Sequence, residues 1–255
     1  MKKYLVAAAV VITLSACSTG TAEEEVKVSS AIPVSQKTVE AREATAYVKK
    51  PIEEMTEEGL TVVHNPESVA VVVNKQRTLP EGYTPEDLTV PDVDFYFDEF
   101  LPKKQMRKEA ATALEELFSA AEKDGQQLVA ASGYRSYERQ KTIFNNYVEV
   151  YGEEKTKTFS AIPGTSEHQT GLAMDVTSAE MSFQLDQSFR DTDEGKWLAD
   201  HAHEYGFIIR YPEGEEDITG YTFEPWHLRY IGKEKAAEVH EQSVTLEEFF
   251  GFMPE

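Results

Sequence analysis

The single cysteine of this chain, Cys17, closes an apolar N-terminal segment, so the chain has no partner for an intramolecular disulfide. That segment begins with Lys2 and Lys3 and continues through an apolar stretch at residues 4–14. It is too short to span a bilayer and is typical of an export signal. The sequence LSAC at residues 14–17 resembles a bacterial lipobox, which predicts a signal peptide at 1–16 and lipidation of Cys17; a plain secretory signal is the alternative.

Lipidation of Cys17 would remove the only thiol, which excludes thiol catalysis and thiolate metal sites. The formal charge of the chain is −21, and removal of residues 1–16 takes away two lysines and no acid, which gives −23. Such an acidic chain disfavours nucleic acid and anionic membrane surfaces as partners. We therefore expect an extracytoplasmic monomer that is attached to the cell membrane only through its lipid.

Residues 17–66 are predicted to form an acidic, flexible tether. They are rich in Ser, Thr, Glu and Lys, and Tyr47 is their only aromatic residue. A short docked helix around residues 38–48 is the alternative. The folded domain is expected to occupy residues 67–255.

The folded part mixes helical and extended patterns without regular alternation, which indicates an α+β class. Strands are expected at residues 68–75, 126–132, 172–177, 207–212 and 226–232. Helices are expected at residues 103–124, 136–151 and 193–205. Gly125 and Gly206 end two of these helices.

Two separated motifs contain the residue types of a zinc site. His168 and Asp175 lie in SEHQTGLAMD, where a turn at Gly171 leads into an expected strand. His227 lies in EPWH, with Glu224 three residues before it. Two imidazoles and a carboxylate suit a catalytic zinc ion, and Glu224 is placed to act as the base for a water molecule there. Each motif alone is weak, since a His–Asp pair is more often only a satisfied polar pair.

The remaining histidines are poorer candidates. His201 and His203 lie in a helical pattern, where a spacing of two directs side chains apart. His64 and His240 have no partner at ligand spacing.

A third motif, SGYRS at residues 132–136, follows an expected strand and opens a helix. The guanidinium of Arg135 at this turn could bind a carboxylate or stabilise an oxyanion; the alternative is a structural ion pair. Together, SGYRSYERQ, SEHQTGLAMDV and EPWHLRYIG, in this order, resemble the zinc D-alanyl-D-alanine carboxypeptidases of the vancomycin-resistance type, a family that includes L,D-carboxypeptidases. The resemblance covers about residues 68–235.

This resemblance implies a small α+β domain of the hedgehog/D-Ala-D-Ala peptidase-like type, whose mainly antiparallel sheet and flanking helices hold one Zn²⁺ per chain in a cleft. It implies that the zinc ligands are His168, Asp175 and His227, and that Glu224 is the general base that then protonates the leaving amine. It also implies that Arg135 stabilises the oxyanion and that Ser166 and Gln140 contact the substrate.

The expected function is removal of the C-terminal D-alanine from peptidoglycan stem peptides by a D-Ala-D-Ala carboxypeptidase, with L,D-carboxypeptidase activity as the alternative. The motifs do not separate D-Ala-D-Ala cleavage from L,D-carboxypeptidase activity on tetrapeptide stems, because the same residues serve both. A non-catalytic cell-wall-binding module is a further alternative, although such a module would be expected to have lost Glu224 or a ligand.

Overall fold

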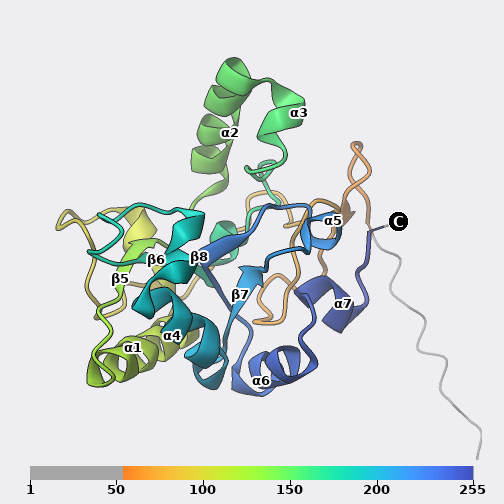
Figure 1. The fold of residues 1–255 in the computed structure, drawn as a ribbon. Coiled ribbons are helices and arrows are strands. Elements are labelled where there is room, and N and C mark those ends of the chain that lie inside the picture. The colour runs from red at the N-terminus through yellow and green to blue at the C-terminus, as the bar shows by residue number, and fades with distance from the viewer. Residues whose placement is uncertain (1–53, 255) are drawn as a thin grey trace, which may run out of the picture. The chain divides into compact units, whose positions relative to one another are not determined.

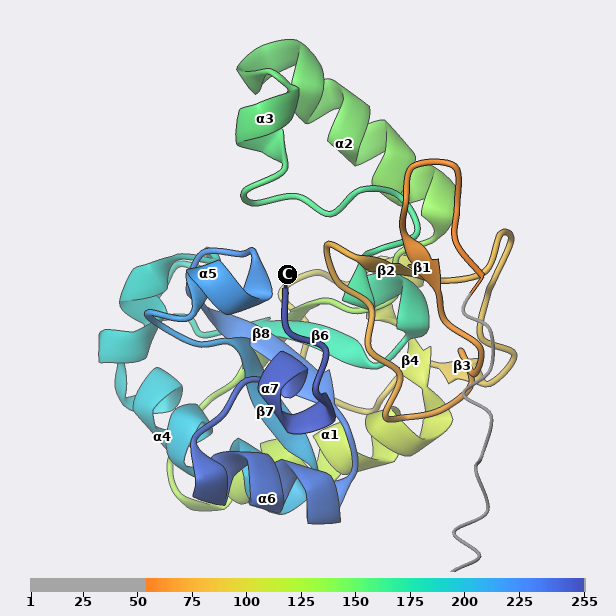
Figure 2. The same cartoon turned by 90° about the vertical axis from the view of Figure 1, so that its right-hand side faces the viewer.

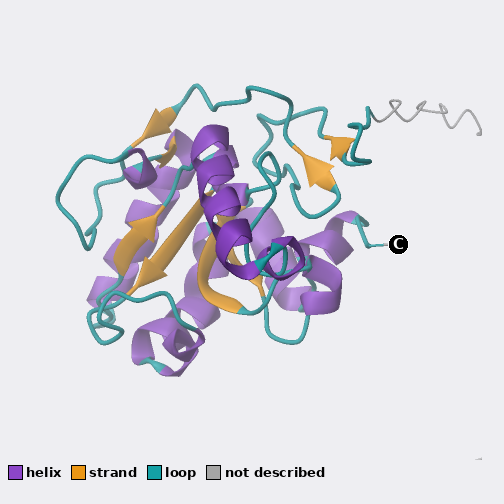
Figure 3. Cartoon of the chain, turned by 90° about the horizontal axis from the view of Figure 1, so that it is seen from above, coloured by secondary structure: helices purple, strands orange, loops and turns teal. Residues whose placement is uncertain are grey.

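Four antiparallel strands form the central sheet of the computed structural model, which describes residues 54–254. The strand order is β5-β6-β8-β7, so the last strand in the sequence is an inner strand (Figures 1 and 3). The strands are β5 Val129–Ser132, β6 Ala173–Thr177, β7 Phe207–Tyr211 and β8 Glu224–Tyr230. All four overlap segments that the sequence predicts as strands, although β8 begins at Glu224 rather than at residue 226, and the α+β class is confirmed.

The two faces of this sheet bury different chemistry. Met174 of β6 and Leu228 of β8 belong to the main hydrophobic core. The next positions along the same strands, Asp175, His227 and Arg229, are buried polar residues. Because side chains alternate across a strand, one face is apolar and the other carries the polar groups.

Two helices contribute to the apolar core. Helix α1 (Lys108–Lys123) buries residues with helical spacing, including Leu114 and Leu117, and α4 (Asp193–His201) adds Trp197 and Leu198. Thr192 caps α4, and its hydroxyl accepts a hydrogen bond from the Gly195 N–H at 3.0 Å. The predicted helices at 103–124 and 193–205 are therefore confirmed in their central parts.

Helices α2 (Tyr137–Tyr151) and α3 (Glu153–Thr156) project from the rest of the structure, above the sheet (Figures 1 and 2). Ser136, which caps α2, marks its start as the sequence predicts. The remaining helices are α5 (Glu216–Thr219), α6 (Lys233–Gln242) and α7 (Leu246–Phe250). Residues of α6 and α7 form a second apolar cluster with Val72, Ile208 and Ile231.

Short elements complete the described part. Two small sheets pair β1 (Thr61–Val62) with β2 (Arg77–Thr78), and β3 (Leu88–Thr89) with β4 (Met106–Arg107). The 3-10 helices are Pro102–Lys104, Glu167–Thr170, Gln187–Asp191 and Ala202–Tyr205. The predicted helix at 103–124 thus begins only at Lys108, because the 3-10 helix Pro102–Lys104 and β4 take up the preceding residues.

The strand predicted at residues 68–75 is wrong. Within this range only Asn74 makes a bridge, to Arg77, and Ser68 to Val71 form a turn. The Arg229 guanidinium donates hydrogen bonds to the carbonyl oxygens of Val69 and Val71. These carbonyls are therefore not available to pair with a neighbouring strand.

The folded part also begins before residue 67, because Thr61–Val62 is a strand and Val63 is buried in the main core. Residues 17–53 of the predicted tether, with Cys17, and the signal peptide lie outside the described residues. Within residues 54–254, no helix has the length and apolar character needed to cross a membrane.

Candidate metal centre and cleft

Asp175 and His227 are brought together by strand register. They are directly paired residues on the neighbouring antiparallel strands β6 and β8, so their side chains leave the same face of the sheet. His168 reaches this face from the 3-10 helix Glu167–Thr170, which Gly171 ends with φ +68°. A Cβ at Gly171 would lie 2.9 Å from Arg107 Cγ, so both the turn and the close packing require glycine.

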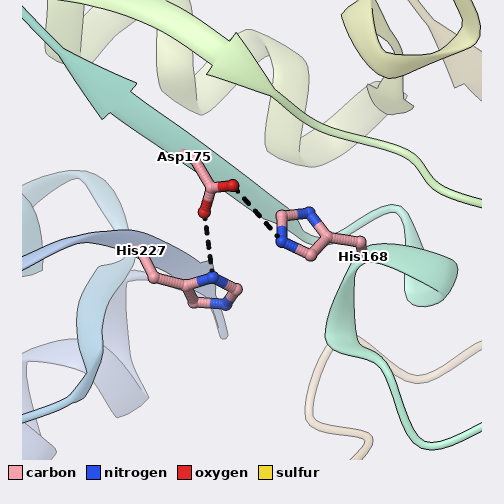
Figure 4. A group of neighbouring side chains, drawn as sticks. All are labelled: His168, Asp175 and His227. Carbon is pink, nitrogen blue, oxygen red and sulfur yellow. Dashed lines mark hydrogen bonds and ion pairs between the residues drawn. The ribbon is translucent and has the colours of Figure 1, made fainter. Parts of the chain in front are cut away.

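The three side chains form a compact, buried cluster (Figure 4). His168 Nε2 lies 3.5 Å from Asp175 Oδ2, and His227 Nδ1 lies 3.0 Å from Asp175 Oδ1. The ligand atoms of the three residues all lie within 4.8 Å of one another. Two nitrogen donors and one oxygen donor, with the cleft open beside them, match the ligand set of a catalytic zinc ion.

Each histidine is oriented by a contact on its other ring nitrogen. His168 Nδ1 lies 2.8 Å from the Gly133 carbonyl oxygen, which leaves Nε2 toward Asp175. His227 is turned the opposite way, with Nε2 at 3.3 Å from Glu167 Oε2 and Nδ1 toward Asp175. Such contacts fix the tautomer and ring orientation of a metal ligand.

The protonation states also suit a metal. Burial lowers the pKa of His168 to about 3, which keeps this imidazole neutral. Burial opposes ionisation of Asp175, but His168 and His227 outweigh it and lower the pKa of that carboxyl. Burial also disfavours a charge on His227, whereas its hydrogen bonds to Asp175 and Glu167 raise its pKa to about 9. A bound metal ion would therefore replace the proton on His227 Nδ1, the nitrogen that faces Asp175.

Glu224 stands next to the cluster at the start of β8. Its Oε2 lies 3.7 Å from His227 Nδ1, and its side chain is the least buried of the acids around this histidine. Burial raises the pKa of Glu224 to about 7, although His227 and Arg135 oppose the shift. A carboxyl with this pKa can take up and release a proton near neutral pH.

Arg135 and Gln140 form one unit. Arg135 donates from Nη1 to Gln140 Oε1 at 2.9 Å, and Gln140 donates from Nε2 to the Ala161 carbonyl at 2.6 Å. Gln140 is fully buried and does not line the cleft, so the structure does not place it as a direct substrate contact. Its amide holds the guanidinium instead, and sequence spacing alone does not distinguish these roles.

The cleft holds about 310 Å³ and joins these residues to an aromatic wall. Ser166 lines it, together with Arg135, Glu224 and the three candidate ligands. The wall comes partly from Ile143 and Tyr147 of the projecting α2 and partly from residues that the sequence did not single out: Phe159, Leu185, Tyr211, Tyr221 and Trp226. Helical spacing marked Ile143 and Tyr147 only as an apolar face.

The rival histidines lie elsewhere. His201 and His203 belong to α4 and the following 3-10 helix, and His240 lies in α6, where it stacks on His203 at 3.7 Å. His168, Asp175 and His227 form the one group of metal-binding character among residues 54–254.

Comparison with known proteins agrees with this geometry. Residues 103–233 match the family model described as D-alanyl-D-alanine carboxypeptidase. The putative carboxypeptidase YodJ of Bacillus subtilis is 54% identical over 193 residues, which are 76% of this chain and 71% of that protein.

Two solved structures are also similar. The LdcB LD-carboxypeptidase is 51% identical with a TM-score of 0.75, and the match covers 79% of this chain and 95% of that one. A mutant of the vancomycin-resistance D,D-pentapeptidase VanY in complex with Zn(II) is 32% identical with a TM-score of 0.59, over 71% of this chain and 98% of that one.

Proposed function

This chain belongs to the D-alanyl-D-alanine carboxypeptidase family of peptidoglycan enzymes, and from that premise we propose that it is a zinc-dependent carboxypeptidase that removes the terminal D-alanine from stem peptides. The observation that carries the proposal is the cluster of His168, Asp175 and His227 at the floor of a cleft that also contains Glu224 and Arg135. Loss of any of these groups would favour a binding module, and all five are present.

The zinc ion would be held by His168 Nε2, an Asp175 carboxylate oxygen and His227 Nδ1, the atoms that face one another. When bound, zinc supplies Lewis-acid chemistry that makes water nucleophilic near neutral pH. The contacts of the opposite ring nitrogens to Gly133 and Glu167 hold both imidazoles in these orientations.

Glu224 is the proposed general base and then general acid. Its carboxylate takes the proton of the attacking water, and its pKa of about 7 lets it hand that proton to the departing amine nitrogen of D-alanine. Its position in the cleft, 3.7 Å from His227 Nδ1, supports this role.

Arg135 is proposed to stabilise negative charge on the carbonyl oxygen under attack. Its guanidinium lines the cleft and is anchored by Gln140, so the donors are positioned before substrate arrives. Ser166, which lines the same cleft, is a proposed substrate contact.

The proposed catalytic residues would serve either of two bonds, so the choice between them is taken from the similarity to solved structures. The greater similarity to the LdcB LD-carboxypeptidase than to VanY favours cleavage between an L-centre and D-alanine in tetrapeptide stems. Cleavage of D-Ala-D-Ala in pentapeptide stems, to which the family owes its name, is the second candidate.

Mass spectrometry tests the proposal. Purified protein with zinc is incubated separately with stem tetrapeptide and pentapeptide, with EDTA controls. We expect EDTA-sensitive loss of one D-alanine from the tetrapeptide. Loss from the pentapeptide alone would assign D,D-carboxypeptidase activity, and cleavage of neither peptide by zinc-loaded protein would contradict catalysis.

We also propose that Cys17 carries a lipid that anchors a monomeric enzyme outside the cell membrane. Labelling of cells with a fatty-acid probe should mark the natural chain and leave Cys17→Ala unlabelled. Light scattering of the unlipidated protein should give the mass of one chain.

A further inference from the structure

A buried ion network lies behind His227, at the ring nitrogen that faces away from Asp175. It consists of Glu167, Arg210, Arg229 and Glu247, whose side chains have no solvent exposure. Burying four charges is costly unless their geometry is well satisfied, and such a network is weak evidence for stability alone. Its position beside a candidate metal ligand points to another use.

The two oxygens of Glu167 have separate tasks. Oε1 accepts from Arg210 Nε at 2.7 Å and from Arg229 Nη1 at 2.6 Å. Oε2 is left to face His227 Nε2 at 3.3 Å. Two guanidiniums on one oxygen fix the plane of the carboxylate and leave the other oxygen, Oε2, to accept from the histidine.

This arrangement selects one tautomer of His227. If Nε2 carries the hydrogen that Glu167 accepts, then Nδ1 is the nitrogen left for a metal ion, and Nδ1 faces Asp175 at 3.0 Å. His168 achieves the reverse choice with a backbone carbonyl, that of Gly133. The two histidines therefore present different ring nitrogens to the same point.

The network extends to the C-terminal helix. Arg210 Nη1 donates to Glu247 Oε2 at 2.8 Å, and Glu247 lies in α7. Asn74 Nδ2 donates to Glu247 Oε1 at 3.1 Å. Arg210 is thus held on one side by α7 and on the other by Glu167, and the four charges sum to zero.

We propose that Glu167 is a positioning residue for the metal ligand His227, and that Glu247 of α7 supports it through Arg210. The inference rests on the zinc site of the proposed function. Glu167 fixes the tautomer and orientation of His227 and adds negative charge behind it, which strengthens Nδ1 as a ligand. The C-terminal helix, which contributes no residue to the cleft lining, then contributes to metal affinity.

Zinc affinity, measured by competition with a chromophoric chelator, tests this inference in four proteins: natural chain, Glu167→Gln, Glu247→Gln and Glu248→Gln. We expect Glu167→Gln to bind zinc 10–100-fold more weakly, the range for such supporting groups. Glu247→Gln should lose affinity in the same direction and by less. Glu248→Gln is the matched control, because Glu248 is exposed on α7 and glutamine can fill its capping role.

Circular dichroism of the metal-free proteins separates positioning from folding. A residue that only neutralises arginines would lower the melting temperature and leave the zinc affinity of the folded protein unchanged, which would overturn the inference. Failure of the natural chain to bind zinc would instead contradict the proposed function.

A measurement on the natural chain removes the dependence on variants that fail to fold. Long-range ¹H–¹⁵N correlation of the zinc-loaded protein should show His227 with a hydrogen on Nε2 and His168 with a hydrogen on Nδ1. A hydrogen on Nδ1 of His227 would overturn the role of Glu167.

Discussion

The buried carboxylates around His227 fall into two groups that differ in their partners more than in their burial. Asp175 and Glu224 face imidazole rings and line the open cleft. Glu167 and Glu247 accept from buried guanidiniums, and Glu167 also faces His227 and lines the cleft. Burial raises the pKa of Glu224 to about 7, whereas for Glu167 burial is outweighed by Arg210 and Arg229, which lower its pKa.

The comparison shows how one sheet face supports both chemistry and structure. The carboxyl of Glu224, which lies 3.7 Å from the nearest imidazole nitrogen of His227, keeps a pKa near neutrality and can exchange protons. A carboxyl between two guanidiniums is permanently charged and serves as a rigid acceptor. Partner identity, set by which strand residues share a face, therefore separates the proton-transfer site from its support.

The largest effect is expected at the group with weak partners. Glu224→Gln should lower kcat by about 10³–10⁴-fold, because the amide cannot take or return a proton. Zinc content should stay at one equivalent, since Glu224 is not in the ligand cluster. Stopped assays with stem peptide and elemental analysis measure both, and an active Glu224→Gln protein would show that another group is the base.

Removing a guanidinium partner of Glu167 and Glu247 should instead lower the stability of the fold. Arg210→Met leaves Glu167 without one of its two guanidiniums and Glu247 with Asn74 alone. The free energy of unfolding should fall by about 3–5 kcal/mol, the cost of breaking a buried ion pair. Urea unfolding of the metal-free protein measures this, and a loss below about 1 kcal/mol would mean that water reaches these charges.

The sequence indicated the residues of the metal site, but not the strand pairing that brings them together. Turn and strand patterns around Gly171 and Glu224 indicated where His168, Asp175 and His227 lie, and the structure brings all three together. The direct pairing of Asp175 with His227 depends on strand register, which arises from contacts distant in sequence.

The supporting residues were missed for the same reason. Arg210 and Arg229 lie in predicted strands, where an arginine suggests a solvent-facing position, yet both are fully buried. Both arginines lie on the sheet face opposite to the main apolar core. For Arg229 a signal was available in the sequence, because it lies two residues after His227 in the same strand and therefore points to the same face. The apolar run at 68–75 was misassigned because its carbonyls bond to Arg229, which no local pattern encodes.

Arg135 connects the two groups, since it is a guanidinium within the reactive cleft. Arg135→Gln should lower kcat by about 10²–10³-fold, the usual loss for one oxyanion donor. Zinc affinity should be unchanged, because the Arg135 side chain hydrogen-bonds Gln140, and its bond to the ligand residue His168 runs from the backbone N–H, which glutamine keeps. Steady-state kinetics check this; an effect confined to KM would reassign Arg135 to binding of the substrate carboxylate.

The smallest effect is expected at an exposed pair. Lys233 Nζ lies 2.8 Å from Glu116 Oε2, a distance comparable to those in the buried network, but the two side chains are 57% and 51% exposed. Lys233→Met should change the free energy of unfolding by at most about 1 kcal/mol, because water solvates both charges in either state. Urea unfolding of Lys233→Met and Arg210→Met under the same conditions compares the two losses directly, because both variants introduce methionine. If the two variants lost equal stability, charge pairing and not burial would set the energy, and the contrast between the network and the surface would fail.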